Sequence, residues 1–153
     1  MLVYNMALPR TEINETTLGY EDLEEIRIPE GYVRFREWPD MNGPLIEYRA
    51  IWVNEDKRRK GFGKKLIKML AKEVKKRGFK EIYVRANTDG SDDFGKWLTA
   101  VGFRPTYEIE GEEETLGGGS ERRMSFLGHR MVWRNLIDAD RNNRYGFNFK
   151  KKL

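Results

Sequence analysis

The chain has 153 residues, of which 39% are hydrophobic and 35% are charged, and its formal net charge at pH 7 is +4. This length and composition predict one folded domain over residues 1–153 and argue against intrinsic disorder. The absence of cysteine excludes disulfides, a thiolate nucleophile and thiolate metal ligands.

The first third of the chain predicts antiparallel strands. Residues 2–8 form a short apolar run that we interpret as a strand. Residues 25–28 and 32–38 alternate apolar and polar side chains on either side of a turn at Pro29, which predicts a hairpin. A second turn at 39–44 leads into an apolar-rich segment at 45–53, which we expect to be one further strand.

The hydrophobic period changes after Gly63, and the new period predicts an amphipathic helix. Gly78 follows the last apolar turn as its C-terminal cap, and residues 80–86 are expected to form another strand. Because a strand–helix–strand crossover places its strands parallel, we expect 80–86 to run parallel to 45–53. The apolar positions of the helix are Leu66, Ile67, Leu70, Ala71 and Val74, and its opposite face carries Lys64, Lys65, Lys68, Lys72, Lys75 and Lys76.

The second half of the chain predicts a short helix and further strands. Ser91 is the expected N-cap of that helix, and Gly102 is expected to end it. Residues 107–110 and 130–135 are expected to be the final strands, separated by an acidic and glycine-rich loop. From about residue 138 to the end, the sequence predicts a polar, basic C-terminal tail.

Residues 53–66 combine a strand end, a basic turn with Gly61 and Gly63, and a helix that begins immediately. Glycines let the backbone approach phosphate oxygens, the unpaired N–H groups of a first helical turn point at them, and the helix dipole favours their charge. Arg58 and its neighbours add charge-assisted hydrogen bonds. The segment therefore predicts a pyrophosphate site, whereas the plainer interpretation is a basic turn that caps a surface helix.

Two familiar phosphate-binding motifs do not fit this turn. A nucleotide P-loop needs a glycine five positions before its Gly-Lys pair and a Ser or Thr after the Lys, where this sequence has Arg58 and Lys65. The dinucleotide motif G-x-G-x-x-G needs its third glycine where Leu66 stands. Both motifs are excluded.

The run Arg-Arg-Lys-Gly-Phe-Gly at 58–63 resembles the signature of the GNAT acetyltransferase superfamily, and the resemblance covers roughly residues 47–103. It implies an α/β (α+β) fold with a mixed, mostly antiparallel sheet around a central parallel β-α-β unit. It also implies acetyl-coenzyme A as cosubstrate, with no metal, and parallel strands that splay to admit the pantetheine arm. The resemblance implies that backbone groups of Ile51 and Val53 contact this arm. It implies that the pyrophosphate lies against the signature turn, which consists of Arg58, Arg59, Lys60, Gly61, Phe62, Gly63 and Lys64. The main implied contacts to the pyrophosphate are the backbone amides of Arg59, Gly61, Gly63 and Lys64.

The resemblance further implies direct attack of an amine on the thioester in a ternary complex, which needs a base to deprotonate the ammonium. Glu47 is our candidate for this catalytic base, because it lies at the spacing before Arg58 where family members that acetylate protein lysines carry a glutamate. The alternative interpretation is an exposed strand carboxylate that pairs with Arg49 or Arg36. His129, the only histidine, is the other candidate base, although a lone histidine on a strand is more often structural.

The sequence departs from the family pattern in the second helix and near the N-terminus. Leu98 stands where many members have a tyrosine that protonates the departing thiolate, so that role falls to water. Ser91 stands where an asparagine often contacts the cofactor, and Asn87 lies shortly before it, so both are candidate cofactor contacts. The N-terminal helices that usually wall the acceptor site are expected to be reduced.

These observations predict an N-acetyltransferase acting on a primary amine, with a protein amine or an RNA-linked amine as the expected acceptor. Whether the chain forms a homodimer is left open. One histidine and no cysteine argue against zinc chemistry. Without a leader or an apolar run long enough to cross a membrane, we expect a cytoplasmic protein.

Two other functions remain open at this point. The first is a module that keeps the GNAT fold and binds acyl-coenzyme A with little or no activity, as Leu98 suggests. The second is a nucleic-acid-binding protein that uses residues 57–65 and the basic tail, with exposed Tyr145, Phe147 and Phe149 stacking on bases.

Overall fold

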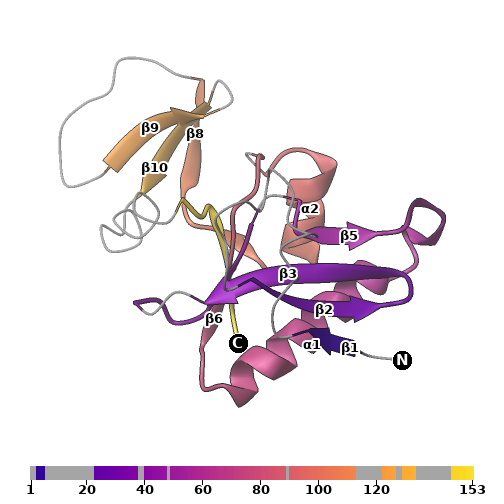
Figure 1. Cartoon of the computed structure of the whole chain (residues 1–153). Coiled ribbons are helices and arrows are strands. Elements are labelled where there is room, and N and C mark those ends of the chain that lie inside the picture. Colours follow the sequence, from indigo (N-terminus) through magenta and orange to yellow (C-terminus); the bar gives the residue numbers. More distant parts are fainter. Residues whose placement is uncertain are drawn as a thin grey trace. The chain divides into compact units, whose positions relative to one another are not determined.

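The computed structural model describes residues 3–5, 23–37, 40–47, 49–88, 90–112, 122–126, 129–133 and 146–153 (Figure 1). The chain divides into two compact units: Met1–Val84 with Lys152–Leu153 is unit 1, and Arg85–Lys151 is unit 2. The single domain expected from the chain length stays a prediction. The expectations for residues 6–22, which include the reduced N-terminal helices, and for residues 138–145 lie outside the described residues.

Unit 1 contains a mixed sheet that is mostly antiparallel, as the sequence predicted. Its strands lie in the order β1-β2-β3-β4-β6, and β5 also pairs with β3. All of these pairs are antiparallel except β4 with β6, which are parallel and enclose the helix α1 in sequence. The strands are β1 (Val3–Asn5), β2 (Glu24–Ile28), β3 (Gly31–Glu37), β4 (Pro44–Ile46), β5 (Ile51–Val53) and β6 (Glu81–Val84).

The predicted hairpin is formed by β2 and β3, with Ile28 opposite Gly31. A side chain at Gly31 would overlap the carbonyl oxygen of Trp52 in β5. Glycine is therefore required here because the neighbouring backbone passes too close to leave room for a Cβ atom.

The prediction of one strand over 45–53 is wrong, because this run divides into β4 and β5. Arg36 pairs with Leu45 and Val33 with Ile51, so residues 34–35 of β3 lie opposite residues 46–50. The extra residues form a bulge in which the amide of Ala50 donates to the carbonyl of Glu47 at 3.2 Å and Arg49 has a φ of 56°. Consequently the parallel pairing with β6 is confined to β4, at Leu45–Tyr83 and Ile46–Val84.

The predicted amphipathic helix is α1 (Phe62–Lys76), which packs on β2 and β3. Four of its apolar side chains are at most 1% exposed, and burial of each contributes roughly 1.5–3 kcal/mol, whereas the predicted core position Ala71 is only partly buried. After Arg77, Gly78 adopts a φ of 88°, and the amides of Gly78 and Phe79 donate to the carbonyls of Lys75 and Val74. This is the Schellman arrangement, so the predicted role of Gly78 is confirmed. The buried residues of α1 are Leu66, Ile67, Leu70 and Val74.

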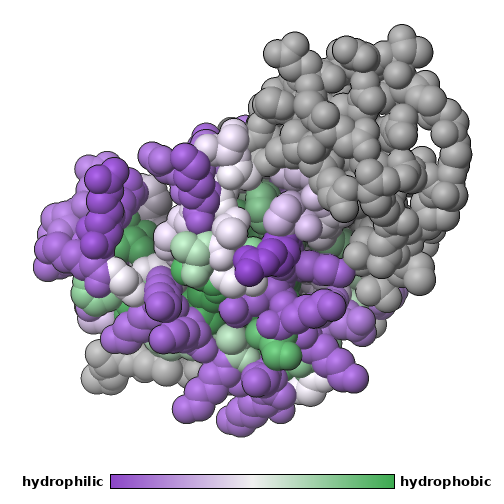
Figure 2. All heavy atoms as spheres, turned by 180° about the vertical axis from the view of Figure 1, so that it is seen from behind, coloured by the Kyte–Doolittle hydropathy of each residue, from purple (hydrophilic) through white to green (hydrophobic). Residues whose placement is uncertain are grey.

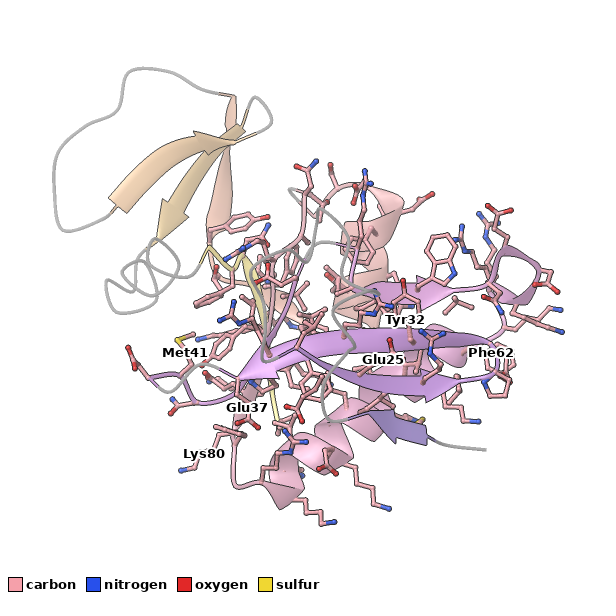
Figure 3. All side chains as sticks on the ribbon, viewed as in Figure 1. Glu25, Tyr32, Glu37, Met41, Phe62 and Lys80 are labelled. Atoms are coloured by element: carbon pink, nitrogen blue, oxygen red, sulfur yellow. The ribbon has the colours of Figure 1, made fainter. Side chains whose placement is uncertain are left out.

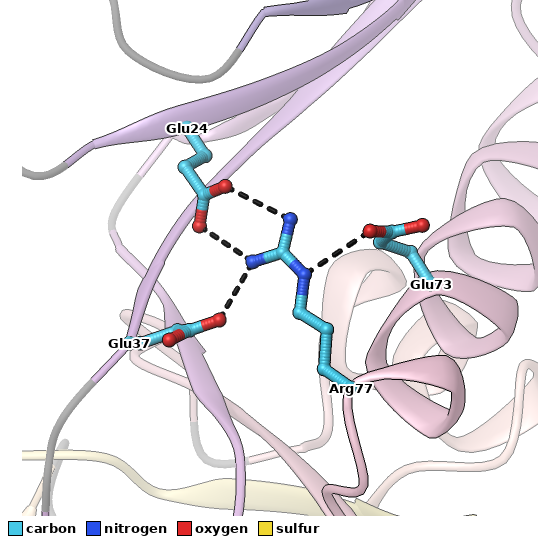
Figure 4. A network of polar contacts seen from close by, with 4 residues as sticks. All are labelled: Glu24, Glu37, Glu73 and Arg77. Carbon is cyan, nitrogen blue, oxygen red and sulfur yellow. Dashed lines mark hydrogen bonds and ion pairs between the residues drawn. The ribbon is translucent and has the colours of Figure 1, made fainter.

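Arg77 ties the C-terminal end of α1 to the sheet (Figure 4). Its guanidinium donates to both carboxylate oxygens of Glu24 in β2, at 2.8 and 2.9 Å, and to Glu37 in β3 at 2.6 Å. It also donates to Glu73 in α1 at 3.1 Å. The hydrogen bonds from Arg77 to Glu24 are the largest cause that raises the pKa of the guanidinium above its ordinary value. The group is therefore a permanent cation, placed where the helix dipole favours one.

Unit 2 contains the second helix, α2 (Asp93–Ala100), and two groups of strands. Strand β7 (Arg104–Pro105) pairs antiparallel with β11 (Phe149–Lys152). A separate sheet has the order β8-β10-β9, formed by β8 (Glu108–Glu112), β9 (Arg122–Phe126) and β10 (His129–Trp133). The sequence predicted β8 and β10 with shifted ends, but it did not predict β9 or β11.

Two expectations for unit 2 need correction. The N-cap of α2 is Asp92 and not Ser91, because the Asp92 carboxylate accepts from the amide of Gly95 at 2.8 Å. Phe147 and Phe149 are fully buried, so they are core residues and not exposed stacking platforms. The reason is tertiary: residues 149–152 form β11, and the Asn148 side chain bonds both the amide and the carbonyl of Ala86.

Candidate functional site

The basic turn joins β5 to α1 through a short 3₁₀ helix, Glu55–Lys57. Arg59 has a φ of 62° and Gly61 a φ of 88°, so the backbone visits the left-handed region twice before α1 begins at Phe62. A non-glycine residue in that region is uncommon and costs free energy. The turn is therefore held in a strained conformation directly before the helix.

The N-terminus of α1 has the features of an anion site. Its N-cap is Gly61, no described side chain caps it, and its first turn contains no acidic residue. The first intrahelical bond is donated by Lys65 to Gly61, so the amides of Phe62, Gly63 and Lys64 have no acceptor within the helix. A Cβ atom built on Gly61 would meet nothing within 4 Å. Open space, amides without an acceptor in the helix and the positive end of the helix dipole thus coincide.

Arg58, the first signature residue, is held by β5. Its Nε donates to the carbonyl oxygen of Val53 at 2.8 Å, and its guanidinium lies 4.5 Å from the centre of the Trp52 ring. Trp52 is 42% exposed. The sequence did not predict this pairing, and its only signal was an aromatic residue one position before the strand ends. The direction of the Arg58 side chain is therefore fixed. Its Nε bonds Val53, and its other two guanidinium nitrogens do not take part in that bond.

The backbone of β5 presents one edge to β3 and the other edge away from it. Arg34 donates to the carbonyl of Ala50, and Asn54 donates to the carbonyl of Glu30. In an antiparallel ladder, hydrogen-bonded residue pairs alternate with pairs that are not hydrogen-bonded. Trp52 and Tyr32 are therefore the hydrogen-bonded pair between these two bonds, and the backbone groups of Ile51 and Val53 point to the other edge of β5. Among the described strands, β5 pairs with β3 alone. The backbone N–H and C=O groups of Ile51 and Val53 thus point away from β3, which is the orientation that the predicted contacts to the pantetheine arm require.

Glu47 lies in the bulge between β4 and β5, and β5 then leads into the signature turn. It is 3% exposed, so the interpretation of an exposed strand carboxylate is wrong. Burial of a carboxylate is costly, and such groups are rarely buried without a structural or chemical reason. The structure therefore leaves Glu47 eligible as a base without assigning it that role.

A cluster of arginines and aromatic side chains lies on the β2–β3 hairpin next to β5 (Figure 3). Arg27 and Arg34 both donate to Glu25, at 2.6 and 2.9 Å, and both guanidinium groups lie within 4.8 Å of the Tyr32 ring centre. Burial alone raises the pKa of Glu25, but the hydrogen bonds and charges of the two arginines outweigh it, so its pKa is lowered. Tyr32 is the cross-strand neighbour of Trp52.

The other predicted site residues belong to unit 2. Asn87 and Ser91 are exposed on the loop before α2. Leu98 is fully buried in α2, so this position holds a core side chain. His129 begins β10, where it pairs with Glu112 and Phe126. Among the residues that the structure describes, no group of three or more His, Cys, Asp or Glu is placed to hold a metal ion.

The acetyltransferase (GNAT) family pattern matches residues 11–96, which is more than half of the chain. The chain belongs to the GNAT acetyltransferase family. The match contains the bulge, the signature turn and α1, and it ends within α2. No curated protein sequence matches this GNAT chain significantly. Among the described helices, none combines the length and apolar character needed to cross a membrane.

Three solved acetyltransferase structures are similar in fold and align with nearly the whole chain. An "IAA acetyltransferase" from Bacillus cereus is 16% identical with a TM-score of 0.56, and each chain is covered to 100%. A Bacillus subtilis acetyltransferase solved with CoA is 15% identical, with a TM-score of 0.55 and coverage of 99% and 97%. A GNAT acetyltransferase from Elizabethkingia anophelis solved with acetyl-CoA has the same identity and TM-score, with coverage of 100% and 97%. At these identities the likeness is one of fold.

Proposed function

We propose that this GNAT protein binds acetyl-coenzyme A at the signature turn and transfers the acetyl group to a primary amine. The observation that carries the proposal is the start of α1, where uncapped amides, open space at Gly61 and a basic turn coincide. Two neighbours of the same fold were solved with CoA or acetyl-CoA, which supports the choice of acyl donor.

In this proposal the backbone holds the cofactor. The amides of Arg59, Gly61, Gly63 and Lys64 bind the pyrophosphate, and the side chains of the basic turn add charge. The pantetheine arm follows the outer edge of β5 and bonds the backbone of Ile51 and Val53. The Val53 carbonyl has a second lone pair, so it can keep its bond from Arg58 while it accepts another. Asn87 and Ser91 are proposed as further polar contacts.

Glu47 is the proposed base. An alkylammonium has an unperturbed pKa near 10.4, so most of an amine acceptor is protonated at neutral pH and must lose a proton before it reacts. Acetyl-coenzyme A, when bound, supplies the thioester carbonyl. Because Leu98 is buried and apolar, protonation of the departing thiolate falls to water, which is sufficient for a thiol of pKa about 8.5.

The substitution Glu47→Gln tests the proposed base. We expect kcat to fall about 100-fold, the usual size of a general-base contribution, with partial recovery at high pH and no change in the melting shift that acetyl-CoA causes. Glu30→Gln is a control, since Glu30 is partly buried at the turn before β3. His129→Gln tests the other candidate base. If Glu47→Gln is as fast as the parent protein, Glu47 has a structural role only.

The acceptor is proposed to be a macromolecular amine, on a protein or linked to RNA. Incubation with acetyl-CoA and a cell extract, followed by a search for added acetyl mass, identifies it. Efficient acetylation of a small polyamine would contradict the macromolecular acceptor. The competing function, an acyl-CoA-binding module without turnover, is favoured by Leu98; it predicts a melting shift with acetyl-CoA but no thiol release with any amine.

A further inference from the structure

The helix α1 carries a row of exposed lysines along its whole solvent face. Lys64, Lys68, Lys72 and Lys76 follow one another at intervals of four residues, which places them one above the other. The sole acid in α1 is Glu73, and Arg77 already binds it at 3.1 Å. We call the exposed residues Lys64, Lys65, Lys68, Lys72, Lys75 and Lys76 the lysine row.

This arrangement opposes the stability of the helix. Like charges four residues apart repel each other, and the lysine row contains three such pairs: 64 with 68, 68 with 72, and 72 with 76. Lys64 and Lys65 also lie in the first turn, where the helix dipole disfavours cations. A solvent-exposed helix face is more stable when acidic and basic side chains alternate along it. The lysine row contains no acidic residue, so it lacks this stabilisation. A polyanionic partner would turn this cost into attraction.

The row extends too far to serve the acetyl donor alone. Lys68 lies about 9 Å along the helix axis from Phe62, and Lys76 lies about 21 Å from it, at a rise of 1.5 Å per residue. A pyrophosphate bound at Gly61 interacts with the first turn of the helix. The pyrophosphate therefore leaves four lysines of the row without an anionic partner: Lys68, Lys72, Lys75 and Lys76.

A membrane surface is a poor match for this face. Helices that lie on membranes insert apolar side chains beside their lysines. The apolar residues Leu66, Ile67, Leu70 and Val74 of α1 are at most 1% exposed, so they are committed to the core of unit 1. The face drawn in Figure 2 is mainly hydrophilic, with small hydrophobic areas between the polar side chains. The remaining apolar residues of α1, which are Phe62, Met69 and Ala71, are only partly exposed, so the lysines form a line with little apolar surface beside them. Such a line fits a linear row of phosphates.

We infer that the lysine row of α1 binds the phosphate backbone of a nucleic acid. This partner differs from the acetyl donor, and the inference does not rest on the proposed function. Each lysine that neutralises a phosphate releases a counterion, which makes the affinity depend on salt. The contact positions a nucleic acid without reading its sequence, because backbone contacts carry no base information.

The test compares two double variants that remove the same charge. Lys68→Gln with Lys72→Gln removes all three repulsive pairs of the row, and Lys80→Gln with Lys96→Gln removes two exposed lysines elsewhere. The probe is a labelled mixed-sequence DNA duplex, titrated at several salt concentrations. For the row variant we expect the slope of log affinity against log salt to fall by about 2, with the control unchanged. We also expect its melting temperature in low salt to rise by about 2 °C, because the repulsion is removed.

Several results would overturn the inference. Equal loss of binding in both double variants would show that net charge alone attracts the duplex. Absence of binding by the parent protein, or tighter binding to vesicles of anionic lipid than to DNA, would do the same. The melting shift caused by acetyl-CoA should be equal in all proteins tested, so its loss would point to failure of the cofactor site and not of the lysine row.

Discussion

The two α-helices of the described residues, α1 and α2, begin in opposite ways. At α2, Asp92 accepts from the amide of Gly95, Thr88 donates to the same carboxylate, and the acidic Asp93 fills the first turn. At α1, a glycine occupies the N-cap, no described side chain caps the helix, and lysines fill the first turn. Helix α2 therefore caps its own first turn, whereas the first turn of α1 has no described side-chain cap and is where we propose that the pyrophosphate binds.

The glycines near the two helix starts show the same difference. A Cβ atom on Gly95 would collide with the backbone of Gly90, so the first turn of α2 is closed by its own loop. A Cβ atom on Gly61 would meet nothing. The sequence alone does not distinguish these two glycines. Gly95 packs against the protein and serves stability, whereas Gly61 faces open space and serves binding in our proposal.

The largest expected effect is that of Gly61→Ala on cofactor binding. The new methyl group would occupy the space assigned to the pyrophosphate, so the stabilisation by acetyl-CoA, about 2.7 kcal/mol at 100 times the parent Kd, should disappear from thermal melts. Gly78→Ala is a matched control, because Gly78 has the same φ of 88° and equally open surroundings at the other end of α1. Both variants should lose about 1–2 kcal/mol of stability from the left-handed conformation. If acetyl-CoA raises the melting temperature of Gly61→Ala as much as that of the parent protein, the cofactor site does not lie at this turn.

A smaller effect is expected for Gly95→Ala at the start of α2. The added methyl group meets backbone atoms of Gly90 that cannot move aside cheaply, and overpacking of this kind costs about 1–3 kcal/mol. Urea denaturation measures the loss as a lower midpoint with an unchanged slope. Tolerance of alanine at this position would show that the loop is not fixed against α2, and the contrast between the helix starts would fail.

The smallest effect is expected for Asp92→Ala. Removal of the side-chain cap exposes the amide of Gly95 and leaves the hydroxyl of Thr88 without this acceptor, at a cost of about 1 kcal/mol. Asp92→Asn keeps an acceptor oxygen and should restore most of the stability. Equal melting temperatures for the parent and the alanine variant would mean that α2 is not closed by its cap.

Local sequence patterns were sufficient for several elements. The apolar spacing in α1, the Schellman glycine at 78 and the period-two hairpin of β2 and β3 depend on neighbours within a few residues, and the structure confirms all three. The signature run at 58–63 likewise pointed to the family to which the chain belongs. These features were readable because backbone geometry and side-chain periodicity are short-range properties.

Contacts between distant segments decided the rest. The run at 45–53 is rich in apolar residues with Glu47 and Arg49 among them, and no local signal showed that residues 46–50 would bulge opposite β3 and bury Glu47. Phe149 stands in a basic, tail-like sequence, yet its strand pairs with β7 more than forty positions earlier in the chain. Arg58 could be assigned to the turn, but the carbonyl of Val53 and the ring of Trp52 fix its direction. The sequence by itself determined the amphipathic helix, the hairpin and the place of the basic turn before that helix. Tertiary pairing alone decided where the run at 45–53 divides into two strands and which side chains are buried, because both depend on partners that periodicity cannot identify.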